Sequence, residues 1–278
     1  MKQTIKKMIP APILHHALRQ RDRIKLHATT HRDFPHQNLK AGITSDLLTL
    51  TFNNPDIARV WEEANKKISE IFGSTTALGG VNPGDRRALY YLVSLLKPEN
   101  LLEVGTHIGA STIFLAEALS HVSPTARMTT VDILDVNDQQ GPWKKRGLAM
   151  PPRGYLQRLG LADRVAFCAM SSANYLQTSS ERFDLIFLDG DHAANTVYNE
   201  ISWALRLLNK DGVILLHDFY PGTKPLFHDK GIIPGPFMAV DRIMLENPHI
   251  NALPLGRLPW ETKQGTQATS LALLTRQI

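Results

Sequence analysis

The sequence has little cysteine, no long apolar runs and little net charge outside its first forty residues, and each shortage excludes a class of protein. The single cysteine, Cys168, rules out an internal disulfide, and its position in an apolar run predicts a buried, inert thiol. No apolar run is long enough to span a bilayer, and residues 1–18 contain prolines and histidines where a signal peptide needs an apolar centre. We therefore expect a cytoplasmic protein.

The formal net charge of +5 is concentrated at one end of the chain. Residues 1–40 contain nine lysines and arginines but only two aspartates, which leaves the rest of the chain slightly negative. This balance argues against a nucleic-acid-binding surface on the main body. The basic segment includes a possible amphipathic helix at Ile13 to Leu26. It could contact an anionic membrane surface or an acidic partner, but we favour an arm packed on the core or on a second subunit.

The chain also lacks the glycine patterns of the most common nucleotide-binding sites. The apolar run Leu101 to Val104 predicts a buried strand, and a turn with Gly105 and Gly109 follows it. A helix pattern then begins at Ser111. The spacing is neither Gly-x-Gly-x-x-Gly nor a P-loop ending in Gly-Lys-Ser/Thr. A strand, a glycine turn and a helix N-terminus can still bind the phosphate or carboxylate of a nucleotide-like ligand.

Strand and helix patterns alternate along the chain, which predicts an α/β fold with a Rossmann-like, doubly wound, mostly parallel sheet of seven strands. We expect an antiparallel C-terminal strand and a helical N-terminal extension. The predicted strands, some including their carboxyl ends, are 101–104, 128–133, 164–170, 183–192, 212–218, 250–255 and 270–275. The predicted helices are 57–72, 86–96, 111–119 and 196–208.

Acidic and histidine side chains follow several of these strands. Asp132 ends the second strand about twenty residues after the glycine turn, where a doubly wound fold binds ribose hydroxyls, although a turn aspartate is the alternative. Because the carboxyl ends of parallel strands meet at one edge, the remaining side chains should converge there. Charged groups are rarely buried without a partner, and such a cluster behind apolar strands is hard to explain as packing. It therefore predicts a functional site. Its further members are Asp189, Asp191, His192, His217 and Asp218.

Three motifs in this arrangement resemble a known family. Glu103-x-Gly105-x-x-x-Gly109, the run ending in Asp189-Gly-Asp-His192, and the run ending in His217-Asp218 resemble bacterial class I S-adenosylmethionine-dependent methyltransferases. These enzymes are related to the catechol and caffeoyl-CoA O-methyltransferases. The resemblance implies a cofactor site in which Glu103 supports the turn and Asp132 binds the ribose. The other implied cofactor residues are Gly105, Gly109, Ser111, Ser172 and Asp189.

The resemblance also raises the question of a metal. Asp189 and Asp218 match two carboxylate ligands of the divalent cation in the catechol-type enzymes. The third ligand there is an asparagine, and this chain has Phe219 in its place. His217 or Asp191 could replace it, and we take Asp189, His217 and Asp218 as the candidate set for Mg²⁺ or another divalent cation.

His192 occupies the position of the general-base lysine in the catechol-type enzymes. Histidine titrates near neutral pH, so we expect His192, together with Asp189, to deprotonate a substrate hydroxyl. A structural histidine that caps the next helix is the alternative. The predicted function is O-methylation of a hydroxyl on a small molecule, either a natural product or a saccharide.

Two other functions were considered. An NAD-dependent oxidoreductase would need Tyr-x-x-x-Lys on one helix face, and Tyr220 to Lys224 match it by letter. Pro221-Gly222 make such a helix improbable. A non-catalytic module that binds S-adenosylmethionine or a partner is the second alternative.

The resemblance also suggests a division of the chain. We expect a basic helical extension at residues 1–80, acting as a lid or dimer arm, and an S-adenosylmethionine-binding methyltransferase domain at 81–278. A homodimer is plausible. The long connection 135–160 is expected to be either a binding loop or a solvated loop.

Overall fold

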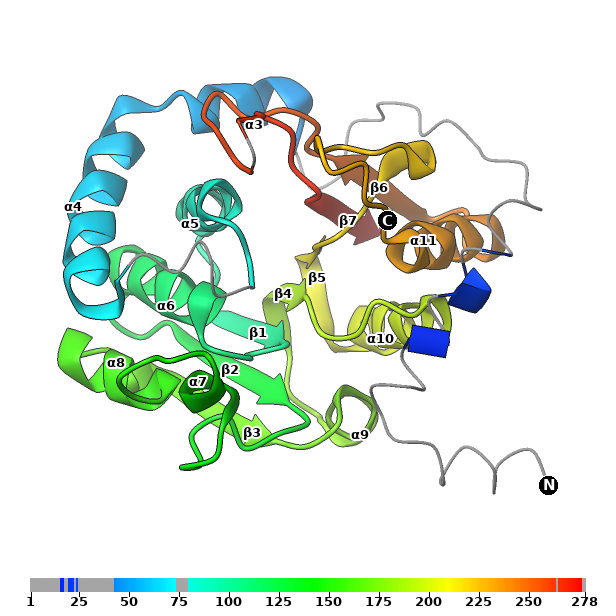
Figure 1. The fold of residues 1–278 in the computed structure, drawn as a ribbon. Helices are drawn as coiled ribbons and strands as arrows, with labels where there is room; N and C mark the ends of the chain where they lie inside the picture. Colours follow the sequence, from blue (N-terminus) through cyan, green and yellow to red (C-terminus); the bar gives the residue numbers. More distant parts are fainter. Residues whose placement is uncertain are drawn as a thin grey trace.

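The computed structural model describes residues 16–17, 20–22, 24, 43–73, 80–263 and 265–276. Its centre is a seven-stranded sheet in the order β3-β2-β1-β4-β5-β7-β6 (Figure 1). Strand β7 is antiparallel to both of its neighbours, and the other paired strands are parallel. The predicted doubly wound sheet with an antiparallel C-terminal strand is therefore confirmed. The strands are β1 (Asn100–Val104), β2 (Arg127–Asp132), β3 (Val165–Ala169), β4 (Phe183–Leu188), β5 (Leu208–Leu216), β6 (Ile250–Pro254) and β7 (Ala272–Arg276).

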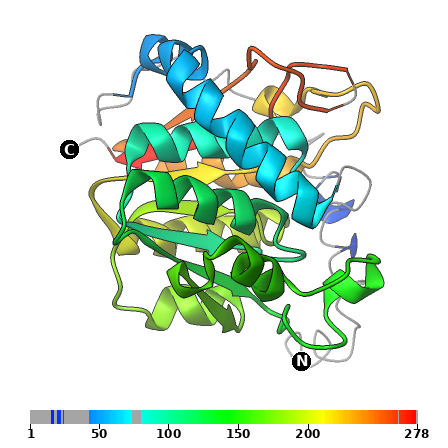
Figure 2. The ribbon, with the colours of Figure 1, turned by 90° about the vertical axis from the view of Figure 1, so that its left-hand side faces the viewer.

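Helices cover both faces of the sheet (Figures 1 and 2). Alternate residues of one strand face opposite layers: Leu185 and Phe187 pack into one hydrophobic cluster, and Ile186 and Leu188 into the other. The first layer contains α3 (Ser45–Phe52), α4 (Pro55–Phe72), α5 (Pro83–Leu96), α6 (Ala110–Val122) and α8 (Pro152–Leu159). The second contains α9 (Ser172–Thr178), α10 (Ala194–Leu207) and α11 (Pro234–Glu246). The short elements are α7 (Pro142–Lys145), η1 (Ala162–Arg164) and η2 (Pro221–Thr223).

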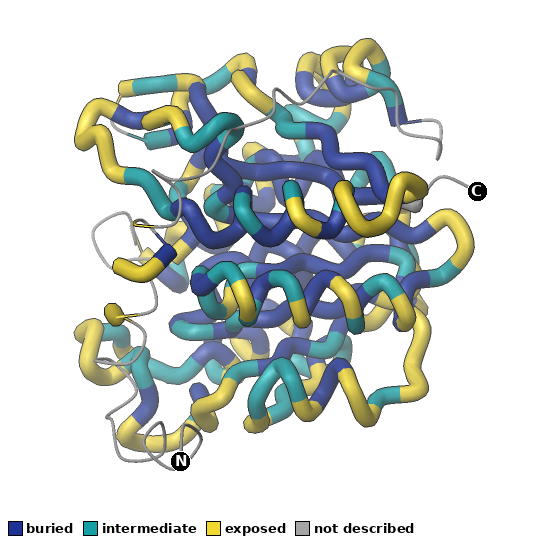
Figure 3. The backbone as a smooth tube through the Cα atoms, turned by 90° about the vertical axis from the view of Figure 1, so that its right-hand side faces the viewer, coloured by how far each residue is buried: buried dark blue, intermediate teal, exposed yellow. Residues whose placement is uncertain are grey.

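The strands are largely buried on both faces, except for the edge strand β3, in which Val165 alone is buried, and the other exposed residues lie mainly on the outer sides of helices and in loops (Figure 3). This explains why the strands appear in the sequence as nearly continuous apolar runs rather than as an alternating pattern. The strand order reverses between the neighbours β1 and β4: the chain continues from β1 to β2 and β3 on one side, and from β4 to β5 on the other. In an open α/β sheet this switch point is where a ligand crevice forms.

The helices at the N-terminal side are part of the same core. The ring of Trp61 on α4 lies 5.4 Å from that of Tyr90 and 5.2 Å from that of Phe114. Phe72 meets Tyr155 edge-on at 4.8 Å. Residues 43–73 thus complete the first helical layer, and the division at residue 80 stays a prediction.

The first forty residues are described only in part. Residues 16–17, 20–22 and 24 have helical backbone, and the rest of the expected helix Ile13 to Leu26 lies outside the described residues. The roles of this segment as lid or dimer arm stay predictions, as does the cytoplasmic location. None of the helices in the described ranges combines the length and apolar character that crossing a bilayer requires.

The connection 135–160 contains more structure than the sequence predicts. It contains α7 and α8, and α8 buries Tyr155 and Leu156 in the core. Pro151 and Pro152 resemble a turn in the sequence, but a proline in the first turn of a helix is favourable because no intrahelical N–H is lost there. Cys168 also differs from expectation, because it is only partly buried.

Candidate functional site

A cavity of about 1210 Å³ opens at the carboxyl edge of the sheet, around the switch point between β1 and β4. The loops after β1, β2, β3, β4 and β5 all contribute to its wall, together with the start of α5 and the loop between β6 and β7. Apart from Glu103, every residue of the predicted catalytic, cofactor and metal sets either lines this cavity or lies in the turn beside it.

The glycine turn after β1 packs directly against the end of β4. Gly105 has φ +102°, and a Cβ atom there would lie 2.3 Å from the carbonyl oxygen of Asp189. Gly109, with φ +79°, precedes α6 as its N-cap, and a Cβ atom there would meet Pro152 at 2.8 Å. Only glycine fits these two positions without strain, so the turn and the Asp189 loop are held together as one unit.

Glu103 is buried in β1, just before this turn, and does not line the cavity. Its buried carboxylate accepts hydrogen bonds from the hydroxyls of Ser111 at 2.5 Å, Thr112 at 2.5 Å and Thr130 at 2.6 Å. Burial raises the pKa of Glu103 to about 7, although the three hydroxyl donors act in the opposite direction. Of this group, Ser111 is the member that reaches the cavity wall. The structure is thus consistent with the supporting role expected for Glu103.

Asp132 lines the cavity at the end of β2. One carboxylate oxygen accepts a hydrogen bond from the backbone N–H of His107 at 2.8 Å, and the other from Leu134 at 3.0 Å. These bonds fix the carboxylate against the glycine turn, and the remaining lone pairs can accept ligand hydroxyls. The next residue, Ile133, also lines the cavity and is 74% exposed. An exposed apolar side chain at this place can pack on a planar ligand group.

The cavity wall beside Ile133 is formed by the loop after β3 and by α10. Ser172 lines the cavity, and its hydroxyl donates to Oε1 of Glu200 at 2.5 Å. Glu200 is buried on α10 and also reaches the cavity. Its pKa is raised to about 8, mainly by burial and also by the charge of Asp191, while the hydrogen bond from Ser172 acts in the opposite direction.

Asp189 is held by a buried histidine on β5's carboxyl side. Nδ1 of His217 lies 2.9 Å from Oδ1 of Asp189, and Nε2 lies 3.3 Å from Oδ2 of Asp85. Asp85 is itself buried and accepts hydrogen bonds from Thr269 and Asn82, both at 2.6 Å. Burial alone would lower the pKa of His217, but the surrounding carboxylates hold it well above its usual value.

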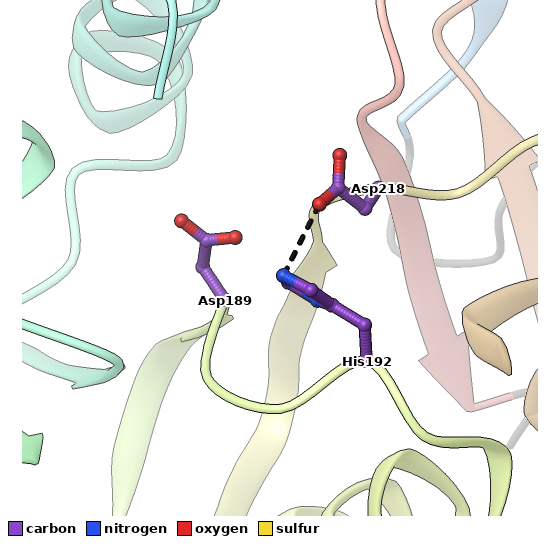
Figure 4. Close-up of side chains that lie close together, drawn as sticks. All are labelled: Asp189, His192 and Asp218. Carbon is purple, nitrogen blue, oxygen red and sulfur yellow. Dashed lines mark ion pairs between the residues drawn. The ribbon is translucent and has the colours of Figure 1, made fainter. Parts of the chain in front are cut away.

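The side chains of His192 and Asp218 face each other close to Asp189 (Figure 4). Nε2 of His192 lies 3.3 Å from Oδ2 of Asp218, and Asp189 stands on the other side of the space (Figure 4). Asp218 has φ +55°, a conformation that is uncommon for a residue with a side chain and typical of functional sites. The backbone N–H of His192 donates to Asp191 at 2.8 Å, so Asp191 shapes the loop that carries the imidazole.

The arrangement offers a metal a different set of ligands from the predicted one. Asp189, His192 and Asp218 each offer one atom, and these atoms lie within 4.8 Å of one another. Both ring nitrogens of His217 already face carboxylates, so His217 is poorly placed as a ligand. Phe219, at the third ligand position of the catechol-type enzymes, is buried and packs on Phe237 with ring centroids 5.8 Å apart.

The lining of the cavity is also partly aromatic. Tyr220 and Phe227 line it, together with Ile233 and Lys263. Tyr220 and Lys224 do not share a helix face, because residues 221–223 form a short 3-10 turn in which Gly222 has φ +58°. The expectation that Pro221-Gly222 prevent a helix between Tyr220 and Lys224 is thus confirmed.

Sequence analysis missed four residues that shape the site. In the sequence, Asp85 resembles an ordinary acidic residue in the first turn of a helix capped by Asn82. Its contact with His217 depends on the tertiary fold. A Cβ atom at Gly235 would lie 2.0 Å from the carbonyl oxygen of His192, so this glycine fixes the His192 loop. Ile133 and Glu200 could have been flagged, the first as the apolar residue after a strand-end acid and the second as an acid within an apolar helical stretch.

Comparison with known proteins gives a consistent result. Residues 102–219 match a family model described as a methyltransferase domain. A catechol O-methyltransferase of Mycobacterium tuberculosis (strain ATCC 25618 / H37Rv) is 32% identical over 135 residues, which is 48% of this chain and 54% of that protein. A catechol O-methyltransferase of Niastella koreensis is 29% identical over 179 residues, 58% of this chain and 73% of the relative. The chain therefore spans only about half the length of the first relative.

Solved structures agree on the fold. The O-methyltransferase TomG from Streptomyces achromogenes, in complex with S-adenosylmethionine, has a TM-score of 0.52 at 17% identity and covers 81% of this chain and 91% of its own. An O-methyltransferase from Bacillus cereus, in complex with S-adenosylhomocysteine, has a TM-score of 0.51 at 21% identity, with coverages of 81% and 94%. At these identities the likeness extends to the fold alone. The matched segment 102–219 contains the glycine turn, Asp132, Asp189, His192 and Asp218.

Proposed function

We propose that this protein, whose residues 102–219 match the family model of a methyltransferase domain, transfers the methyl group of S-adenosylmethionine to a hydroxyl of a small molecule. The observation that carries the proposal is a single cavity that reaches from the glycine turn and Asp132 to His192 and Asp218. Asp132 offers hydrogen-bond acceptors for the ribose of a nucleoside, and His192 offers a base. Catechol O-methyltransferases among the relatives support oxygen as the methyl acceptor.

The cofactor would lie along the carboxyl edge of the sheet. The turn at Gly105 and Gly109 leads into the N-terminus of α6, whose free N–H groups favour the methionine carboxylate. Asp132 would accept the ribose hydroxyls, and the adenine would lie between Ile133 and Ser172. This placement leaves the methyl group near the space between Asp189 and His192.

The chemistry then requires removal of one proton. The acceptor hydroxyl would enter between Asp189 and Asp218 and give its proton to the imidazole of His192, while its oxygen would bond to the methyl carbon. The carbon–sulfur bond would break, and its electron pair would stay on the sulfur as a neutral thioether. Asp218, 3.3 Å from Nε2, stabilises the imidazolium that forms. Holding the reactants in line supplies a large share of the rate, because effective molarities reach about 10⁵–10⁸ M.

A divalent cation is the second possibility for the same three side chains. Asp189, His192 and Asp218 would hold it, and it would supply positive charge that lowers the pKa of the substrate hydroxyl. Such a cation would occupy Nε2, so His192 would no longer be available as the base. The aromatic part of the lining, formed by Tyr220 and Phe227, is where we place the acceptor, which keeps natural products and saccharides as the expected classes.

Calorimetry with S-adenosylmethionine, S-adenosylhomocysteine and NAD tests the proposal. We expect both sulfur nucleosides to bind at micromolar concentration and NAD not to bind. Binding of NAD alone would favour an oxidoreductase instead. Repeating the turnover measurement in excess chelator separates the two mechanisms, because full activity there would remove Asp218 from the ligand list.

A further inference from the structure

One acid on α10 reaches the cavity where the proposed adenine position lies, and the mechanism above makes no use of it. Glu200 is in the second turn of α10 and is buried, yet it forms part of the cavity wall. Its Oε1 accepts the hydroxyl of Ser172 at 2.5 Å. A Cβ atom on Gly190 would lie 3.7 Å from the same oxygen. Glu200 therefore closes the gap between the start of α9 and the loop after β4.

The surroundings of Glu200 favour the protonated form of its carboxyl group. Burial raises its pKa to about 8, and the neighbouring charge of Asp191 acts in the same direction. A neutral carboxyl group has one donor and one acceptor side by side. With Ser172 donating to Oε1, Oε1 would be the carbonyl oxygen, which leaves Oε2 to bear the proton.

This pattern is complementary to one edge of adenine, which has an amino donor at N6 beside an acceptor at N1. Glutamine and asparagine side chains read adenine in nucleic acids with the same pair of a carbonyl acceptor and an N–H donor. A carboxylate would lack the donor, and an apolar residue would lack both groups.

We infer that Glu200 recognises the adenine of the cofactor, its carbonyl oxygen accepting from the amino group and its O–H donating to N1. This inference rests on the proposed function, because it requires a bound adenosine. It adds a buried group from α10 to a site that the strand ends, their loops and the start of α6 otherwise form.

The test is a cycle of two ligands and three proteins. The ligands are S-adenosylhomocysteine and its purine-riboside analogue, which lacks the exocyclic amino group. Calorimetry measures both with the wild-type protein, with Glu200→Met and with Glu200→Gln. We expect the wild-type protein to prefer the amino ligand about tenfold, the value of one hydrogen bond, and Glu200→Met to show no preference. Glu200→Gln keeps a donor and an acceptor and should restore the preference.

A purely structural role for Glu200 predicts a different result. Glu200→Met would then weaken both ligands equally and keep the wild-type ratio, which would overturn the inference. A wild-type protein that binds both ligands equally would overturn it as well, without reference to any variant. If the Glu200→Met variant does not fold, Glu200→Leu is measured in its place. Failure to bind either ligand would reject the proposed function itself, and the adenine contact with it.

Discussion

At the scale of single residues, the proposed chemistry depends on the imidazole of His192 and the two aspartates that flank it (Figure 4). Asp218 is 3.3 Å from Nε2, and Asp189 is held in place by His217, which is anchored in turn by Asp85. Buried hydrogen-bond chains of this kind fix orientation, because breaking one link leaves a buried polar group unsatisfied. The sequence placed Asp189, His192 and Asp218 at one edge, but it contained no signal for the link to Asp85.

Replacing His192 by alanine tests its role as the base. We expect turnover to fall by about 10²–10⁴, the range for a lost general base, while S-adenosylhomocysteine binds with nearly unchanged affinity. His249→Ala is the matched control, since His249 is exposed and precedes β6 at the opposite edge of the sheet. Equal turnover in the two variants would reject the assignment.

Gly235 on α11 should be almost as sensitive, although it contributes no side chain. An added Cβ atom would lie 2.0 Å from the carbonyl oxygen of His192 and 2.7 Å from the backbone nitrogen of Ala194, so the loop must move. A displacement of about 1 Å at a reacting group can cost 10²-fold in rate, and we expect a loss of that order for Gly235→Ala.

The control for this change lies in the same segment. At Gly231 the nearest atom to an added Cβ is the side-chain oxygen Oδ1 of Asp229, at 3.3 Å, and that side chain can adjust. Kinetics of Gly231→Ala should therefore match the wild type. Normal turnover in Gly235→Ala would show that the position of the His192 loop does not depend on α11.

At the scale of secondary-structure elements, α10 is capped by a residue far away in the sequence. Its own N-cap, Ala193, has no side chain that can accept a hydrogen bond. Instead, the buried carboxylate of Asp22 accepts from the backbone N–H of Ala194 at 2.8 Å, and Arg21 donates to Asn195 at 3.1 Å. The basic N-terminal segment is thereby tied to the helix that follows His192.

Removing this cap should destabilise the protein. We expect Asp22→Ala to lower the free energy of unfolding by about 1 kcal/mol, the usual value of an N-cap, as measured by urea denaturation. Asp22→Asn keeps an oxygen acceptor and should stay close to the wild type. An alanine variant as stable as the wild type would mean that this contact contributes nothing in solution.

Element prediction was most accurate where the local signals agreed. Helix α4 has Asn54 as its cap, proline at N1 and Gly73 after its last residue, and its predicted range differs by two residues at the start. Helix α8 was missed because the whole connection 135–160 was expected to be a loop, although Pro151 and Pro152 form a favourable helix start. Helix α11 begins Pro234-Gly-Pro, a sequence more typical of a loop than of a helix start, and this helix was also not predicted.

At the scale of the whole molecule, the sheet could be predicted because buried parallel strands leave apolar runs that helices separate. The resemblance to class I methyltransferases, inferred from the strand ends, is confirmed by the matched family model and by the relatives. Packing between distant segments could not be predicted. The contact of α4 with α5 and α6 and the docking of Asp22 on α10 depend on tertiary contacts that no local pattern encodes.

The proposed function requires that one cavity holds the cofactor along the strand ends with its methyl group facing His192. A crystal structure with S-adenosylhomocysteine tests this claim most directly. We predict that Asp132 contacts the ribose, that Ile133 packs on the adenine, and that the sulfur lies beside the space between Asp189 and His192. A ligand bound elsewhere, or a sulfur turned away from His192, would contradict the account.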